Sequence, residues 1–373
     1  MPYPALPQEL LLIDGRLGCG PSKIRQGQLD AVRDSVAPGT SHRQPPVKHL
    51  VARIREGLRD LFALPDGYEV VLGLGGATAF WDAASFHLVE SRAAHLVYGE
   101  FTSKFAAVTR NAPWLAEPHV VSAEPGDAPL PSSLNGVDAD VVAWAHNETS
   151  TGVMLPVTRP DTDALTVVDA TSAAGGLPVD AREADAYYFS PQKCFGADGG
   201  LWIALLSPAA IERIERIAAS GRFVPSFLNL AVALENSRKD QTYNTPAITT
   251  LVMLAEQLDW MRAAGGLEVM ASRTLASSSS FYAWADAHEL AAPFVRDPKL
   301  RSQVVGTVDF DESVDAAELA AALRANGIVD TEPYRKLGRN QLRVGMFPNV
   351  EPGDIVRFTR AVDYLLSAGV GFK

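Results

Sequence analysis

Six short apolar runs in the first two-thirds of the chain constrain its fold more than any other feature of the sequence. Each run is rich in β-branched or aromatic residues, and several end directly in polar, Gly-rich or acidic residues. Apolar residues occupy both faces of each run, which is typical of strands that helices cover on both sides. The pattern therefore predicts an α/β fold. The runs are Tyr68–Leu72, Ala94–Tyr98, Asp140–Ala145, Leu165–Asp169, Ala186–Phe189 and Leu201–Leu206.

The last third of the chain has a different pattern, in which long amphipathic helices alternate with two strands. The first helix spans Ala247–Ala264 and ends at a pair of glycines, which favour helix termination. A helix Leu267–His288, a strand Gln303–Phe310, a helix Asp315–Asn326, a strand Gln341–Met346 and a helix Gly353–Ser367 follow. We therefore predict a large domain over 1–260 and a smaller C-terminal α+β domain over 261–373, on which the N-terminal segment is free to pack.

The composition excludes several classes of partner. The chain has 33 Lys and Arg against 44 Asp and Glu, a formal net charge of -11, so we expect no nucleic-acid or anionic-membrane partner. Two cysteines, Cys19 and Cys194, are too few for a disulfide framework. The beginning of the chain lacks the basic region of a signal peptide, and no stretch approaches the roughly 18–20 apolar residues that span a bilayer. We expect a cytoplasmic enzyme.

Several catalytic motifs are incomplete, and we reject them. Gly15–Gly20 has the glycine spacing of a P-loop, but Pro21 stands where that loop needs a lysine. Gly73–Gly76 lacks the third glycine of a dinucleotide-binding loop. His42 and His49 do not have zinc-ligand spacing with any second pair of ligands. We therefore expect no metal site.

An aspartate and a lysine together indicate a cofactor. Asp169 ends a buried apolar strand, where an unpaired carboxylate is costly and needs a cationic or hydrogen-bonding partner. Lys193 follows in a loop between two other predicted strands, where desolvation lowers the pKa of an amine. A lysine and an acid are the two side chains that a protein contributes to the chemistry of a pyridoxal phosphate site. The lysine forms a Schiff base, and the acid keeps the pyridine nitrogen protonated so that the ring acts as an electron sink.

Two further features supply the rest of such a site. The stretch Gly75-Gly-Ala-Thr78 opens a predicted helix, whose N-terminus can hold the cofactor's phosphate. Phe101 closely follows a predicted strand and offers an aromatic face to the ring. Taken singly, each signal has an ordinary explanation, since a strand-end aspartate usually caps a turn, a loop lysine is usually solvated and a Gly-Gly pair is usually only a turn. Their order and spacing together favour the cofactor site.

Longer stretches of the sequence support a specific family. They occur from about residue 15 to the end, and they are Gly18–Lys23, Gly39–Gln44, Gly75–Asp82, Tyr98–Phe101, Ala145–Gly152, Val168–Ser172, Ser190–Lys193, Asn244–Pro246 and Tyr334–Arg343. In these stretches the chain resembles the phosphoserine aminotransferases, which are class V, fold-type I pyridoxal phosphate enzymes, and most closely their actinobacterial branch. The resemblance implies a mostly parallel seven-stranded sheet in the large domain, a smaller C-terminal domain and a homodimer.

The resemblance also implies roles for the residues that would contact the cofactor. Lys193 would bond it and shuttle a proton, and Asp169 would pair with the pyridinium nitrogen. Phe101 would stack on the ring, and Thr149 would hydrogen-bond the region of its 3′ oxygen. The residues that would hold the phosphate are Ala77, Thr78 and Gln192, joined by Asn244 and Thr245 from the partner subunit.

For the substrate, the resemblance implies two anion-binding groups. Arg343 would bind the α-carboxylate. The distal anion is either the phosphate of phosphoserine or the side-chain carboxylate of glutamate, and its pocket would be formed by His42, Arg43 and Arg335. The charge pattern favours such pockets independently, because 335–343 carries four cations and no acid, and 41–49 carries a second basic patch.

The chain departs from the family pattern at four positions. Phe101 stands where many members have Trp, Thr78 where many have Arg, Tyr334 where His is common, and Cys194 where Asn is common. These departures leave the reaction class unchanged but leave open which side chains grip the phosphate. Because Cys194 adjoins Lys193, inhibition by oxidation of its thiol is a hypothesis.

The resemblance implies reversible transfer of an amino group between L-glutamate and 3-phosphohydroxypyruvate, giving O-phospho-L-serine and 2-oxoglutarate in serine biosynthesis. The 4-phosphohydroxy-L-threonine step of pyridoxine biosynthesis is a second candidate reaction. Three alternatives stay open. An alanine or serine–glyoxylate-type aminotransferase of class V would not use the second cationic pocket. A cysteine desulfurase or related lyase needs a cysteine in the small domain, and 261–373 contains none. A non-enzymatic binding protein would be expected to lose Lys193 or Arg343.

Overall fold

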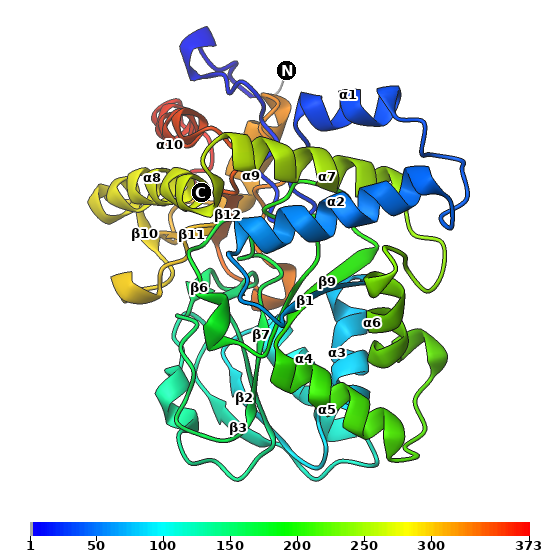
Figure 1. Ribbon diagram of the computed structural model, residues 1–373. Helices are drawn as coiled ribbons and strands as arrows, with labels where there is room; N and C mark the ends of the chain where they lie inside the picture. Colours follow the sequence, from blue (N-terminus) through cyan, green and yellow to red (C-terminus); the bar gives the residue numbers. More distant parts are fainter. Residues whose placement is uncertain (1–2) are drawn as a thin grey trace.

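The computed structural model describes residues 3–373, so only residues 1 and 2 of the predicted large domain lie outside it. The strands of its central sheet are β1 Glu69–Leu74, β2 Ala93–Val97, β3 His119–Ser122, β4 Val141–Ala145, β7 Leu165–Asp169, β8 Ala186–Phe189 and β9 Leu201–Leu206. They lie in the order β1-β9-β8-β7-β4-β2-β3 (Figure 1). Strand β9 is antiparallel to both of its neighbours, and the other neighbouring strands are parallel. The predicted α/β fold with a mostly parallel seven-stranded sheet is confirmed.

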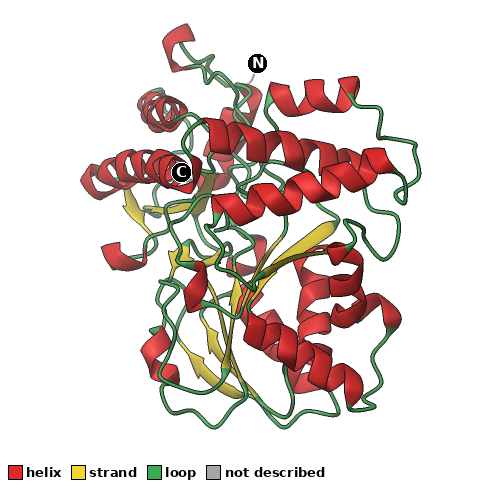
Figure 2. Cartoon of the chain, viewed as in Figure 1, coloured by secondary structure: helices red, strands yellow, loops and turns green. Residues whose placement is uncertain are grey.

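Helices cover both faces of this sheet (Figure 2). One face is covered by α2 Pro45–Leu61 and α7 Ile248–Ala263, on which α1 Gln26–Asp34 packs, and the other by α3 Gly76–His87, α4 Glu100–Asn111, α5 Pro208–Ala219 and α6 Leu230–Arg238. Strand β8 shows why its sequence is apolar throughout. Tyr187 belongs to the core under α2 and α7, whereas its neighbour Tyr188 belongs to the core under α3 to α6. Alternate residues of this strand therefore point into the two apolar cores on opposite faces of the sheet.

All eight predicted strands occur, six in the large sheet and two in the C-terminal third, but short or polar edge strands were not predicted. Strand β3 lies at the edge of the sheet, and its four residues are exposed or half-buried, so they carry no apolar run. The hairpin of β5 Asn147–Glu148 and β6 Val153–Met154 has only two residues in each strand. Elements this short have no periodicity that a sequence can display.

The C-terminal third forms a second sheet, and its core also takes up the N-terminal segment. Its elements are α8 Gly266–Ala287, β10 Ala291–Pro293, β11 Val305–Phe310, α9 Ala316–Ala325, β12 Gln341–Gly345 and α10 Pro352–Ser367. Asp315 caps α9 by accepting from the backbone N–H groups of Ala317 and Glu318. Leu6 and Leu17 join the apolar core of this part. The predicted division at residue 260 falls inside α7 and stays a prediction.

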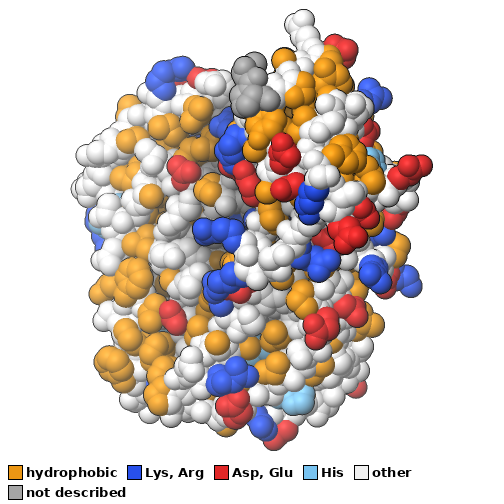
Figure 3. All heavy atoms as spheres, turned by 180° about the vertical axis from the view of Figure 1, so that it is seen from behind, with side chains coloured by type: hydrophobic (Ala, Val, Ile, Leu, Met, Phe, Trp, Pro, Cys, Tyr) orange, Lys and Arg blue, Asp and Glu red, His pale blue; other side chains and the backbone are white. Residues whose placement is uncertain are grey.

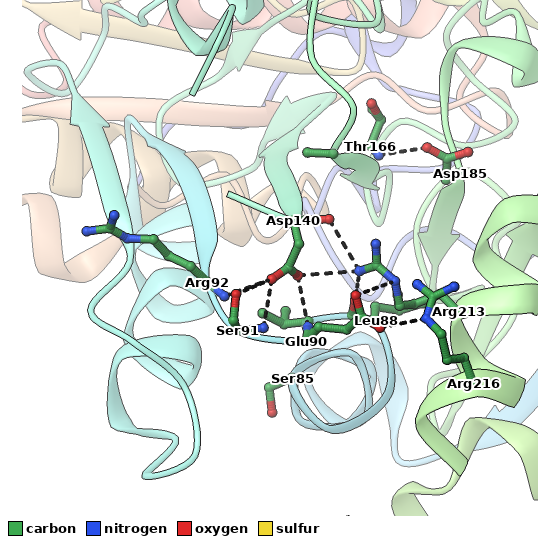
Figure 4. Close-up of polar contacts among 12 residues, drawn as sticks. Ser85, Leu88, Glu90, Ser91, Arg92, Asp140, Thr166, Asp185, Arg213 and Arg216 are labelled. Carbon is green, nitrogen blue, oxygen red and sulfur yellow. Dashed lines mark hydrogen bonds and ion pairs between the residues drawn. The ribbon is translucent and has the colours of Figure 1, made fainter. Parts of the chain in front are cut away.

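The carboxylate of Asp140 binds several groups at the amino end of β4 in the large sheet. Asp140 accepts from the backbone N–H groups of Glu90, Ser91 and Arg92 at 2.8, 2.7 and 2.9 Å (Figure 4). The Arg213 guanidinium lies 3.4 Å from the same carboxylate and donates to the Leu88 carbonyl at 2.7 Å. This cluster ties the loop before β2 to β4 and α5. It lies at the amino ends of the strands, away from the polar residues at their carboxyl ends.

The surface carries side chains of both charges. Figure 3 shows them interspersed with apolar groups on the face turned away in Figure 1. Over residues 3–373, no helix is both long enough and apolar enough to cross a membrane.

Candidate active site

Asp169 lies at the carboxyl end of β7, and three donors surround its carboxylate. Its Oδ1 accepts from the backbone N–H of Thr171 at 2.9 Å. Its Oδ2 is 3.2 Å from the indole nitrogen of Trp81 and 3.1 Å from the hydroxyl of Tyr188. Burial raises the pKa of Asp169, and these hydrogen bonds oppose that rise. A buried carboxylate of this kind is suited to face a cation such as a protonated ring nitrogen.

Lys193 lies in the loop after β8, and its amine is largely enclosed. Its Nζ donates to the carbonyl oxygen of Cys19 at 2.5 Å. Desolvation, assisted by the nearby charge of Arg343, lowers the pKa of Lys193 to about 8. An appreciable fraction of this amine is therefore neutral near physiological pH, as a nucleophile or a general base requires.

The N-terminus of α3 matches the predicted phosphate site. Gly75 and Gly76 both have positive φ, 102° and 74°, which lets the chain turn directly from β1 into the helix. Ala77 and Thr78 follow in its first turn, where backbone N–H groups are free to bind an anion. The Oε1 atom of Gln192 is buried and has no hydrogen-bond partner in the structure. This unpaired oxygen can accept a hydrogen bond from a bound ligand or from a bridging water.

Phe101 is fixed by a buried carboxylate on the β5–β6 hairpin. Glu148 accepts at Oε2 from the backbone N–H groups of Phe101 and Thr102, at 3.1 and 2.9 Å, and at Oε1 from Ser150. It thereby caps the N-terminus of α4, which carries Phe101. Phe101 and Asp169 line one small cavity, so an aromatic ring and a buried acid lie close together.

Thr149 and Arg343 meet at the side of this site. An Nη1 atom of Arg343 donates to the carbonyl of Thr149 at 2.9 Å, while its buried Nε has no partner. The Thr149 hydroxyl donates to Ser172 Oγ at 2.8 Å. The Arg343 guanidinium also lies 5.4 Å from the centre of the Tyr334 ring. Arg343 is thus pre-oriented with donor capacity left for a carboxylate.

The basic segment 335–343 offers fewer free cations than the sequence predicted. Lys336 pairs with Glu100 of α4, and Arg339 pairs with Asp309 of β11. These two cations are therefore neutralised by acids that are distant in the sequence. Arg335 is exposed and forms no ion pair within residues 3–373.

His42, Arg43, Asn244 and Thr245 form a separate group. Arg43 donates to the carbonyl of Tyr243 at 2.8 Å, and Nδ1 of His42 is 3.0 Å from the Thr245 hydroxyl. These residues belong to the turn before α2 and the loop between α6 and α7. Figure 1 shows the start of α2 and the α6–α7 loop at one edge of the molecule, away from β12. Within the described chain, no hydrogen bond joins them to the Lys193 group. A single chain therefore does not bring all the predicted site residues together.

The structure argues against oxidation of Cys194. Its thiol is fully buried and donates to the carbonyl of Ser172 at 3.3 Å. Burial raises the pKa of Cys194 far above its usual value, so the reactive thiolate does not form.

Several residues around the site escaped prediction. Trp81, Tyr188 and Thr171 hold Asp169, Glu148 holds Phe101, and Ser172 holds Thr149. Strand alternation in the run Ala186–Phe189 could have placed the Tyr188 side chain on one face, but not beside Asp169. Within residues 3–373, no group of three His, Cys, Asp or Glu side chains is placed to hold a metal.

Known proteins resemble this chain over nearly its whole length. The family model "Aminotransferase class-V" matches residues 26–331. A phosphoserine aminotransferase of Corynebacterium glutamicum is 60% identical over 100% of this chain and 99% of its own. One from Rhodococcus opacus is 60% identical over 98% of both chains. Among solved structures, a phosphoserine aminotransferase from Cytophaga hutchinsonii superposes with a TM-score of 0.85 at 24% identity, covering 94% of this chain and 99% of that one. That last likeness concerns the fold alone.

Proposed function

The chain belongs to the class-V aminotransferase family, and we propose that it is a phosphoserine aminotransferase that uses pyridoxal 5′-phosphate. It moves an amino group between L-glutamate and 3-phosphohydroxypyruvate, giving 2-oxoglutarate and O-phospho-L-serine. The observation that carries the proposal is the meeting of three groups in one site. These are an enclosed lysine with a pKa of about 8, a buried aspartate and an arginine with an unpaired Nε. Relatives of this name at 60% identity support the choice of substrates.

In the proposed reaction the protein holds and orients the cofactor and the substrate, and it moves a proton. When bound, pyridoxal phosphate supplies an electron sink for the carbon that loses its proton. Lys193 would hold the cofactor and would remove and return that proton, because its lowered pKa lets the amine act as base and acid. Asp169 would pair with the ring nitrogen, and Phe101 would pack against the ring. The free N–H groups of α3, with the amide NH₂ of Gln192, would bind the phosphate.

Substrate recognition rests on two cationic groups. Arg343 binds the α-carboxylate with the donors that Thr149 leaves free. Arg335 has no acidic partner in the described chain and faces the distal anion. Tyr334 lies between Phe101 and Arg343. Its ring centre is 6.0 Å from that of Phe101, and the Arg343 guanidinium lies over it.

A homodimer completes the pocket. Asn244 and Thr245 are exposed, and we assign them, with His42 and Arg43, to the site of the partner subunit. The exposed rings of Phe227 and Tyr243 support this assignment, because they line one cavity beside the β1–α3 turn and a solvated aromatic patch favours a partner. A mixture of a Lys193→Ala variant and a Thr245→Trp variant, each inactive alone, would regain activity by forming mixed dimers. Failure of the mixture would contradict shared sites.

We place the enzyme in the cytoplasm, where two free buried thiols are stable. The 4-phosphohydroxy-L-threonine step is proposed as a second reaction of the same pocket, since that substrate also carries a phosphate. A turnover assay with L-glutamate and the keto form of this substrate tests the idea, because transfer of the amino group would convert glutamate to 2-oxoglutarate. The absence of 2-oxoglutarate formation from glutamate would contradict it.

The deciding experiment follows the visible band of the purified protein during addition of O-phospho-L-serine, L-glutamate, L-alanine or L-cysteine. We expect bleaching by phosphoserine and glutamate but not by alanine. Bleaching by alanine alone would move the function to a glyoxylate- or pyruvate-type aminotransferase. Rapid sulfide release from cysteine would indicate a lyase, although the only cysteines are Cys19 and Cys194, both outside the small domain. The absence of a visible band would contradict the cofactor.

A further inference from the structure

Tyr188 stands directly beside Asp169. Parallel pairing of β7 with β8 places these two residues opposite one another, and the N–H of Ala170 donates to the Tyr188 carbonyl at 2.7 Å. The Tyr188 ring is fully buried and stacks on Phe80, with ring centres 4.3 Å apart and planes inclined by 24°. Two adjacent strands and a packed core therefore fix the phenol at 3.1 Å from the carboxylate.

The direction of each hydrogen bond follows from which groups can donate and which can only accept. An indole nitrogen only donates, and Trp81 lies closer to the Tyr188 oxygen, at 2.8 Å, than to Asp169, at 3.2 Å. Trp81 therefore donates to Tyr188, and the Tyr188 hydroxyl donates its own proton to Asp169. The backbone N–H of Thr171 donates to the other oxygen of Asp169, Oδ1. Both carboxylate oxygens therefore accept hydrogen bonds. Such a set stabilises the ionised form.

We propose that Tyr188, supported by Trp81, is a positioning residue that keeps Asp169 ionised and aimed at the cofactor's ring nitrogen. The inference rests on the proposed function, because it assigns the carboxylate to pyridoxal phosphate. A carboxylate that accepts a strong hydrogen bond is a weaker base, so the proton shared between Asp169 and the ring stays on the ring nitrogen. The ring then keeps the positive charge on which its action as an electron sink depends.

Other titratable groups lie near this carboxylate. They are Tyr98 directly after β2, Lys193 in the loop after β8 and, packed on the opposite face of the sheet, Tyr187. Arg343 on β12 lies next to Lys193. Burial raises the pKa of each of these tyrosines well above its usual value, so they stay neutral over the working pH range. In the holoenzyme, the readout is the pH midpoint of the visible band, which reports the protonation of the Lys193 nitrogen.

Tyr188→Phe in the holoenzyme removes one hydroxyl, and Tyr187→Phe is the matched control. Tyr187 is adjacent and equally buried, but its hydroxyl contacts His146 at 3.1 Å and not Asp169. We expect Tyr188→Phe to raise the pH midpoint of the visible band, because a ring with less positive charge repels the proton on the Lys193 nitrogen less. We expect kcat to fall about tenfold, as the loss of one charged hydrogen bond implies, with KM for glutamate little changed. Tyr187→Phe should leave both quantities unchanged.

Trp81→Phe is a second test if Tyr188→Phe does not fold. It removes the donor behind the phenol and should move the midpoint in the same direction by a smaller amount. An unchanged midpoint in the Tyr188 and Trp81 variants that fold, or an equal shift in Tyr187→Phe, would overturn the inference and leave the proposed function intact. A wild-type protein with no visible band would overturn both.

Discussion

The amine of Lys193 passes so close to Gly20 that only a glycine leaves room for it. A Cβ atom at position 20 would lie 2.1 Å from Nζ and 2.5 Å from Cε of Lys193, and Gly20 has φ of +131°. The carbonyl of the preceding residue, Cys19, accepts the hydrogen bond from that amine. The N-terminal segment thus forms one wall of the candidate site.

The first prediction concerns this wall. Gly20→Ala should displace the Lys193 side chain and lower kcat by about 10²-fold, within the range that general acid–base catalysis contributes. Gly136→Ala is the control, because Gly136 also has positive φ, +64°, but its Cβ would contact nothing within 4 Å. Steady-state kinetics on both variants checks this. Equal losses would mean that backbone strain, rather than the displaced amine, is responsible.

The lowered pKa of Lys193 predicts a pH-dependent stability of the cofactor-free protein. Its pKa is about 8 in the fold against about 10.4 in an unfolded chain, so the unfolded state binds the proton more tightly. Protonated Lys193 therefore destabilises the fold below pH 8, and that cost disappears as pH rises to about 10.4. Urea unfolding should show the stability of wild type rising relative to Lys193→Met across this window. A constant difference would contradict the lowered pKa.

Glu148 is predicted to hold Phe101 in place through its cap on α4. Glu148→Gln turns an amide donor toward backbone N–H groups, which should cost about 1–3 kcal/mol in the free energy of unfolding. We also expect weaker visible circular dichroism, since the ring that packs on the cofactor loosens. Glu117→Gln, on the surface beside Arg110, is the control for both measurements. A destabilised variant with an unaltered spectrum would show that Glu148 has only a structural role.

Asp140 is predicted to affect stability without affecting the site. Asp140→Asn places an NH₂ group either against the N–H of Glu90 or against the N–H groups of Ser91 and Arg92, at a cost of about 1–3 kcal/mol (Figure 4). The neighbouring Asp138 is fully exposed, so Asp138→Asn should leave the melting temperature nearly unchanged. Thermal unfolding compares the two variants. A changed visible band in Asp140→Asn would contradict its purely structural role.

Both cysteines are predicted to be inert in the folded protein. Burial raises the pKa of the Cys19 and Cys194 thiols, and neither side chain is accessible. Brief treatment with peroxide should leave activity unchanged, and a thiol reagent should react with both cysteines only after unfolding. Rapid modification of the native protein, accompanied by loss of activity, would restore the oxidation hypothesis.

The local sequence was sufficient to predict much of this protein. Apolar runs with no polar face predicted strands buried between two layers, and the β7 and β9 boundaries match those runs residue for residue. Asp169 and Lys193 were predictable as a pair because a strand-end acid and a loop lysine in such a sheet need partners. Resemblance to a family extended the set to Phe101, Thr149 and Arg343.

Other features depended on contacts between residues far apart in the chain. The partners of Lys336 and Arg339 are Glu100 and Asp309, so charge counted along the sequence overstated the free basic cluster. The group formed by His42 and Thr245 joins segments about 200 residues apart, and this contact forms only when both loops are folded.

What the sequence by itself determined is which segments become strands and helices, and which residue types are available for chemistry, because those follow from local patterns of burial. Only the tertiary structure decided which of these residues meet. Strand register sets Tyr188 beside Asp169, and the docking of a hairpin on α4 sets Glu148 under Phe101. The physical reason is that a pKa, an ion pair or a hydrogen bond depends on distances of a few ångströms between groups, and packing rather than sequence separation sets those distances.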